Sequence, residues 1–177
     1  MSIRVEGPAR GRLLRPRRPA IEGNPNFMQQ AIALAVENVR TGAGGPFGAV
    51  VVRDGRVIAT GVNRVTSTHD PTAHAEVVAI RAACQVLGDF QLHGCAVYTS
   101  CEPCPMCLAA LYWSRCDAIF YGCSAADAAA AGFDDSFLYA EVSRPISERK
   151  IPTQRLLGDQ AMETFDTWRA QTNKIEY

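Results

Sequence analysis

The spacing of apolar residues predicts that the chain opens with a helix. Over residues 27–40, apolar side chains recur at the intervals of one helix face, at Ile32, Val36 and Val39. Asn26 and Gln29 have the spacing of a capping box at its start, and Gly42 marks its end. We therefore expect one helix ahead of the first strand.

The next pattern predicts a β-hairpin, followed by alternating helices and strands. Two β-branched runs, 47–53 and 56–61, are joined by Asp54-Gly55, a dipeptide that favours a tight hairpin turn. The later pattern predicts a helix at 73–87 closed by Gly88, a strand at 95–99, a helix at 105–114 that begins with Pro105, a strand at 117–122, and helices at 124–131, 136–142 and 161–171.

The order of these elements indicates an α/β fold. Strands that are separated by helices favour parallel pairing, whereas the opening hairpin adds an antiparallel pair. We therefore expect a three-layer α/β/α sandwich, in which a mixed central sheet carries helices on both faces.

Length and composition suit a single domain. The 177 residues are 47% apolar and 20% charged, an ordinary balance for a protein with one core. No apolar run reaches the length of a membrane span, and the start lacks the apolar stretch of a secretory signal. We expect a cytoplasmic protein with no membrane contact.

Charge is distributed unevenly, although the formal net charge is zero. Residues 1–20 hold six arginines and one acid, Glu6. Without them, the 18 basic and 18 acidic residues fall to 12 and 17, so the remainder is acidic. Because an acidic surface repels a phosphate backbone, we expect no nucleic-acid partner. We interpret residues 1–22 as a disordered Arg- and Pro-rich arm ahead of a folded domain at 23–177, with nucleic-acid contact as the alternative for the arm.

The cysteine content favours metal binding over disulfides. Seven cysteines are an odd number, and no secretory signal precedes them. In a reducing compartment, a closely spaced cysteine pair more often binds a metal ion. We interpret the other five as small buried apolar residues.

Two short segments combine the ligands of a zinc site. His74 opens one predicted helix, while Cys104 and Cys107 open another and lie on one face of its first turn. One imidazole and two thiolates supply three ligands, and a catalytic zinc keeps its fourth position for water. The positive N-terminal end of a helix also favours thiolates.

Glu76 follows His74 by two residues, so that near a helix start both side chains can reach one point. A carboxylate beside water activated by zinc can take a proton from it and return the proton to the substrate. H-x-E followed by P-C-x-x-C is the pattern of zinc nucleobase deaminases, whose glutamate is a general acid/base. The alternative is a structural zinc site with Cys101 as fourth ligand, which leaves Glu76 without a role. His69 and His93 are interpreted as loop or surface histidines.

Several stretches carry a resemblance to a known family. From about residue 26 to the C-terminus the chain resembles the cytidine-deaminase superfamily. The stretches that carry this resemblance are 44–50 (GGPFGAV), 70–76 (DPTAHAE) and 99–107 (TSCEPCPMC). Within that superfamily, the less generic stretches look like the bacterial guanine deaminases, and they are 132–137 (GFDDSF), 148–152 (ERKIP) and 173–177 (NKIEY).

The resemblance implies a homodimer whose C-terminal segment crosses to the partner, placing Tyr177 over the neighbouring active site. It also implies roles for individual residues. The zinc ligands are His74, Cys104 and Cys107, and Glu76 is the proton shuttle. Further residues match substrate contacts: Asn63 as a base-contacting amide, Phe47 and Trp113 against the purine, Asp135 as acceptor from the guanine N–H edge, and Glu141 near the leaving amine.

Each substrate contact has a plain structural alternative. Phe47 and Trp113 also suit core positions, and Asn63 suits a turn. Asp134 or Asp135 suits a cap on the following helix, so one can cap while the other binds. Tyr177 also suits a frayed chain end.

The resemblance implies hydrolytic deamination of guanine to xanthine and ammonia, with zinc as cofactor and a small purine base as partner. The alternatives are deamination of another aminated heterocycle such as ammeline or cytosine, deamination of a flipped adenosine in tRNA, and a zinc-stabilised binding module without catalysis.

Overall fold

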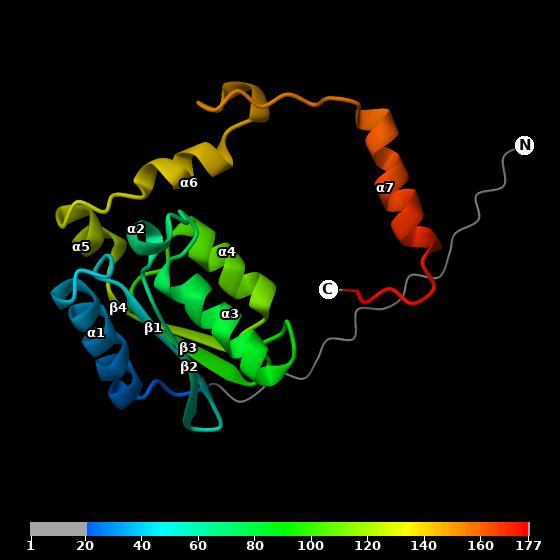
Figure 1. Ribbon diagram of the computed structural model, residues 1–177. Helices are drawn as coiled ribbons and strands as arrows, with labels where there is room; N and C mark the ends of the chain where they lie inside the picture. The colour runs from blue at the N-terminus through cyan, green and yellow to red at the C-terminus, as the bar shows by residue number, and fades with distance from the viewer. Residues whose placement is uncertain (1–20, 177) are drawn as a thin grey trace, which may run out of the picture.

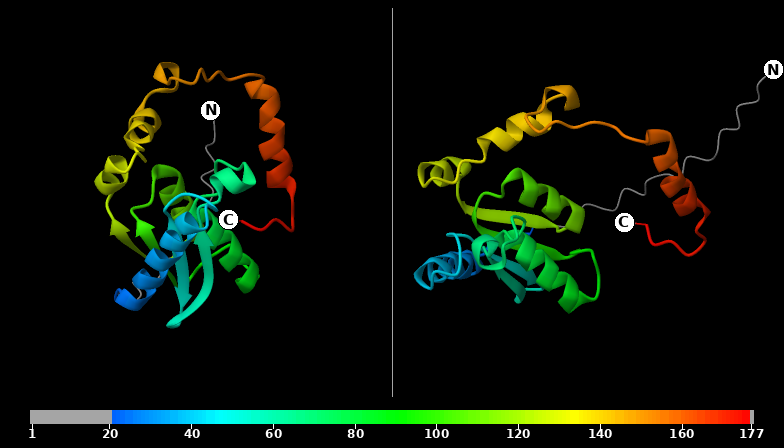
Figure 2. Two further views of the ribbon diagram at one scale, coloured as in Figure 1. Left: turned by 60° about the vertical axis from the view of Figure 1, so that its left-hand side comes forward. Right: turned by 45° about the horizontal axis from the view of Figure 1, so that its top comes forward.

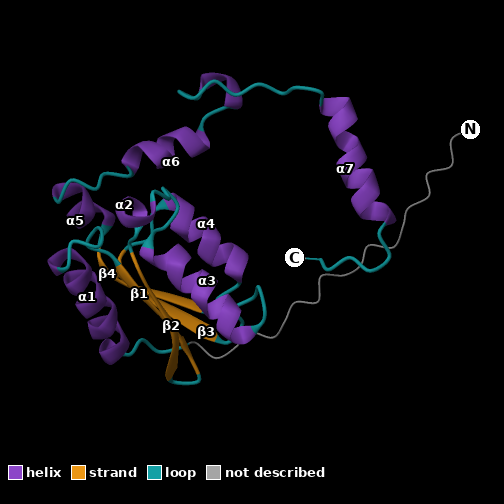
Figure 3. Ribbon diagram, in the orientation of Figure 1, coloured by secondary structure: helices purple, strands orange, loops and turns teal. Residues whose placement is uncertain are grey.

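The computed structural model describes residues 21–176, in which helices surround a four-stranded sheet (Figures 1 and 3). In chain order the elements are α1 (Pro25–Arg40), β1 (Gly48–Arg53), β2 (Arg56–Val62), α2 (Val65–Thr68), α3 (Ala75–Leu87), β3 (Cys95–Cys101), α4 (Pro105–Ser114), β4 (Ala118–Cys123), α5 (Ala125–Ala130), α6 (Ser136–Ser143), a 3-10 turn (Ile146–Glu148) and α7 (Gly158–Ala170). Every predicted helix and strand is present, with ends within three residues of those expected.

The sheet is mixed, and its strand order is β2-β1-β3-β4. β1 runs antiparallel to both β2 and β3, whereas β3 and β4 are parallel. The hairpin turn takes positive φ at Asp54 and Gly55, as the sequence predicts. The pairing of β1 with β3 is a finding of the structure, because no local pattern records which strand inserts beside the hairpin.

Alternate residues of the inner strands point to opposite faces of the sheet, and each face has its own core. On one face, β1 and β3 meet α3 and α4 through a cluster that includes Val51, Ala79, Val97 and Leu111. On the other face they meet α1 through Ala31, Val50, Ala96 and Tyr98. The two helical layers are visible on either side of the sheet in Figure 1. The expected α/β/α sandwich is therefore confirmed.

The start of α1 differs from the expected capping box. The helix begins at Pro25, and the Asn24 side chain accepts the backbone N–H of Asn26, so Asn24 is the N-cap. Proline suits a first helical position because it lacks the N–H that would otherwise be unpaired there. The proposed box of Asn26 with Gln29 is therefore wrong.

The buried face of α1 is lined by small and polar residues. It presents Ala31, Ala35 and Asn38 to the sheet, whereas Val39 is 50% exposed. Small side chains let the helix approach the sheet closely, since a Cβ at Gly48 would lie 2.4 Å from the Ala31 carbonyl oxygen. Asn38 is thus the one polar side chain on this buried line, which spans about two turns of the helix.

The C-terminal part of the described chain lies apart from the sandwich. After α6 the chain passes over the molecule to α7, which stands away from the sheet in each view of Figure 2. The large apolar side chains of α7 and of the segment before it are exposed, and they include Ile151, Leu156, Leu157, Phe165 and Trp168. Within residues 21–176, no helix is both long and apolar enough to cross a membrane.

Candidate active site

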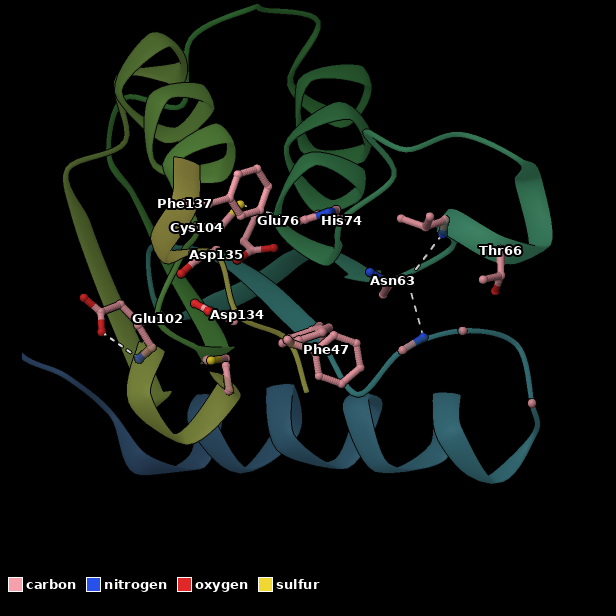
Figure 4. Close-up of a pocket in the computed structure, with 18 residues that line it drawn as sticks. Phe47, Asn63, Thr66, His74, Glu76, Glu102, Cys104, Asp134, Asp135 and Phe137 are labelled. Carbon is pink, nitrogen blue, oxygen red and sulfur yellow. Dashed lines mark hydrogen bonds between the residues drawn. The ribbon is translucent and has the colours of Figure 1, made fainter. Parts of the chain in front are cut away.

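The first turns of α3 and α4 bring the predicted metal ligands together (Figure 4). His74 is the N-cap of α3 and Cys104 is the N-cap of α4, while Cys107 lies in the first turn of α4. The His74 side chain makes no capping bond to α3, and the Cys104 sulfur accepts from Cys107, so both side chains turn toward one point.

The distances between these donors fit zinc. The His74 Nδ1 atom lies 3.6 Å from Cys104 Sγ and 3.4 Å from Cys107 Sγ. Ordinary zinc–sulfur and zinc–nitrogen bonds in tetrahedral geometry require a nitrogen–sulfur separation of about 3.6 Å. Among the described residues these three form a group of potential metal ligands, and Cys101 is not part of it.

The two cysteine thiols differ in how readily they lose a proton. The pKa of Cys104 is lowered to about 4, first because the Cys107 thiol donates to it, and then because His74 does so as well. The pKa of Cys107 is raised by that same hydrogen bond and by burial. Deprotonating both thiols therefore requires a nearby cation, as a divalent metal provides. The chemistry of the donor set thus fits zinc.

Glu76 is held inside the site but outside the ligand set. Its side chain is only 6% exposed, and the Thr99 hydroxyl donates to its Oε1 at 3.4 Å. Burial raises the pKa of its carboxyl group, which favours proton exchange nearer to neutral pH. Glu76 lines the same pocket as His74 and Cys104 (Figure 4), and the Cys107 sulfur lies beside these two ligands.

This pocket has a volume of about 550 Å³ and one wall of aromatic rings. Phe47 and Phe133 pack edge to face with centroids 5.0 Å apart. Phe47 also packs against the core, which confirms the core interpretation, while its contact with a purine stays a prediction. Phe137 lines the same pocket. Flat apolar walls of this kind suit an aromatic heterocycle.

Two polar side chains with defined orientations line the pocket. The Asn63 Oδ1 atom accepts the backbone N–H groups of Gly45 and Val65, each at 3.3 Å. Asp134 accepts the Ser136 N–H at 2.9 Å, whereas Asp135 makes no capping bond. One aspartate therefore bonds to the helix start and the other does not, while both line the pocket, and substrate binding by Asp135 stays a prediction.

Other predicted site residues lie elsewhere in the chain. Trp113, near the end of α4, is 63% exposed and lines a separate hollow. Both carboxylate oxygens of Glu141 are engaged at 2.8 Å, one by the Arg144 guanidinium and one by the backbone N–H of Lys150. Tyr177 lies outside the described residues. A single described chain thus brings neither Trp113 nor Glu141 to the pocket.

Sequence reasoning gave no role to several pocket residues. Glu102 lies between the predicted strand and the cysteine pair, and Phe133 and Phe137 lie near Asp135. The Glu102 carboxylate accepts the Ala125 N–H at 3.0 Å and so ties α5 to the zinc segment. The family-like stretches 99–107 and 132–137 contain Glu102, Phe133 and Phe137, so the motifs indicate the region but not which of its side chains line the pocket.

Replacing single cysteines separates the two kinds of zinc site. We expect Cys104→Ala to lose stoichiometric zinc, because it removes one of three ligands. Cys101→Ala is the matched control, since the Cys101 thiol donates to the Ser124 carbonyl oxygen and not to the ligand group. Zinc content is measured by metal analysis after dialysis. Loss of zinc from Cys101→Ala would instead support a four-ligand structural site.

Comparison with known proteins agrees with this geometry. Residues 22–123 match the cytidine and deoxycytidylate deaminase zinc-binding region. Guanine deaminase of Bacillus subtilis (strain 168) is 56% identical over 151 residues, which cover 85% of this chain and 97% of that protein.

Solved structures show the same similarity. The X-ray structure of guanine deaminase from Bacillus subtilis superposes with a TM-score of 0.86 at 54% identity, covering 88% of this chain and 99% of that chain. A guanine deaminase from Nitrosomonas europaea superposes with a TM-score of 0.60 at 33% identity, covering 67% and 69%. The chain therefore belongs to the zinc-binding cytidine and deoxycytidylate deaminase family.

Proposed function

We propose that this protein is a zinc-dependent guanine deaminase, which hydrolyses guanine to xanthine and ammonia. The observation that carries this proposal is one pocket lined by His74 and Cys104 of the metal-ligand group, by the buried Glu76 and by Asp135, whose carboxylate makes no capping bond. The extensive similarity to a guanine deaminase, which reaches well beyond the zinc-binding region, supports this activity over others in the family.

In this mechanism the chain holds guanine and moves protons. When bound at His74, Cys104 and Cys107, zinc lowers the pKa of a coordinated water. Glu76 takes a proton from the attacking water and delivers it to a ring nitrogen of guanine. The water oxygen adds to C2, the bond from C2 to the amino nitrogen breaks, and Glu76 helps to protonate the amine that leaves as ammonia.

Selectivity in this proposal comes from two polar groups and an aromatic wall. Asp135 accepts hydrogen bonds from the N–H edge of guanine, Asn63 contacts the base, and Phe47 packs against its face. Adenine has no matching N–H donor in the ring, so it would leave the Asp135 carboxylate unpaired. Guanine is therefore preferred over adenine.

The rival substrates are weaker candidates. Ammeline presents an edge similar to that of guanine, while cytosine is more distant. A tRNA substrate is disfavoured because residues 21–177 are acidic. We propose a cytoplasmic location, since all seven cysteines are free in the structure, which suits a reducing compartment.

A substrate panel tests the activity. We expect the zinc-loaded protein to release ammonia from guanine, and we expect adenine, adenosine and cytidine to be silent because none offers Asp135 the guanine edge. Ammonia release and xanthine formation are measured together, with ammeline and cytosine in the same panel. Failure to turn over guanine, with turnover of another base, would reject the assignment.

We further propose a homodimer in which the C-terminal segments are exchanged. Apolar side chains of residues 144–176 remain exposed in one chain, and a second copy can cover them. Exchange would also bring the partner's C-terminal segment to the pocket, with Tyr177 over the base. Within this proposal, contacts of Trp113 and Glu141 with substrate likewise depend on the second copy.

Subunit mixing tests the exchange. We expect co-refolding of Glu76→Gln chains with Tyr177→Ala chains to restore about a quarter of wild-type activity, because half the dimers are mixed and each has one complete site. Each variant refolded alone is the control. Without exchange, the mixture would show only the average activity of the two variants, and a fully active Tyr177→Ala would remove that residue from the site.

A further inference from the structure

Asn38 is a buried polar side chain on α1 that the proposed chemistry leaves without a role. It is 4% exposed and continues the line of Ala31 and Ala35 that faces the sheet. Its Nδ2 atom donates to the backbone carbonyls of Gly45 and Asn63, each at 2.9 Å. Both amide hydrogens of Asn38 are therefore committed to the two segments that frame one side of the pocket.

The same two segments are tied together around Asn63. The Asn63 N–H donates to the Phe47 carbonyl at 3.0 Å, and the Asn63 Oδ1 atom accepts the Gly45 N–H. The chains approach so closely that a Cβ at Gly44 would lie 2.0 Å from the Asn63 carbonyl oxygen and 3.0 Å from Asn38 Nδ2. Removing the Asn38 amide would remove the two hydrogen bonds that hold the Gly45 and Asn63 backbones together from the buried side.

This arrangement fixes the chemical identity of the group that Asn63 presents. Two backbone N–H groups are hydrogen-bond donors, so the side-chain atom they contact must be the oxygen. The Asn63 Nδ2 atom donates no hydrogen bond to any described residue, and Asn63 lines the pocket (Figure 4). The side chain can then offer the substrate only a donor.

We propose that Asn38 is a positioning residue, which holds Asn63 and the loop 44–47 so that the Asn63 amide donates to an acceptor atom on the substrate. This inference rests on the proposed function, in which Asn63 contacts the base. The inference adds that the substrate must carry a hydrogen-bond acceptor opposite the Asn63 amide, in addition to the donors that Asp135 requires. Asn38 acts through Asn63 and does not itself touch the substrate.

A double-mutant cycle tests this role. We expect Asn38→Ala to raise the KM for guanine about tenfold, the effect of one lost hydrogen bond, with a smaller change in kcat. In an Asn63→Ala background the same substitution should have almost no further effect on kcat/KM. Equal losses in both backgrounds would overturn the proposal, because they indicate a general structural role. Thr41→Val is the matched control, since the Thr41 hydroxyl bonds only helix carbonyls at the same end of α1.

A binding measurement separates this proposal from the proposed activity. Calorimetry follows 8-azaguanine, a guanine analogue, in a Glu76→Gln background that removes turnover. Weaker binding after Asn38→Ala supports the positioning role even if wild-type protein fails to deaminate guanine, whereas unchanged binding overturns it. Absence of any binding to the parent protein would overturn both. If Asn38→Ala does not fold, Asn38→Ser, which keeps one short donor, replaces it.

Discussion

The convergence of two helix N-termini on one point governs the chemistry of this protein. His74 and Cys104 occupy cap positions, and Glu76 and Cys107 lie in the first turns behind them. The positive ends of α3 and α4 favour anionic thiolates at that point. Close packing keeps the first turn of α3 in place, because Gly61 on β2 has no Cβ, which would lie 2.2 Å from the Ala75 carbonyl oxygen.

Local patterns in the sequence predict most of the elements and the chemical centre. The Asp54-Gly55 turn, Pro105 at the start of α4 and Gly88 after α3 each mark a boundary through their own backbone preferences. The zinc ligands and Glu76 are recognisable because the chemistry fixes both residue type and spacing along short segments. In these cases a few neighbouring residues contain the complete signal.

Features that depend on segments far apart in the chain cannot be predicted from such local patterns. The burial of Asn38 follows from α1 turning its small residues toward the sheet while Val39 stays half exposed. The choice of Asn24 over Asn26 as cap follows from an additional hydrogen bond, in which the Asn24 N–H donates to the Tyr98 hydroxyl, 74 residues away. In the proposed dimer a second copy covers the exposed apolar residues of the C-terminal segment, and no pattern within one sequence records such a contact.

The central claim is that Glu76 carries protons and does not bind the metal. Its direct test is the rate of guanine deamination by Glu76→Gln together with zinc content, with Glu37→Gln on the exposed face of α1 as control. The account predicts full zinc occupancy with a loss of at least about a hundredfold in kcat, the usual contribution of a general acid/base. Near wild-type turnover by the zinc-loaded variant would contradict the proton-shuttle role, and loss of zinc would show that the carboxylate belongs to the metal site.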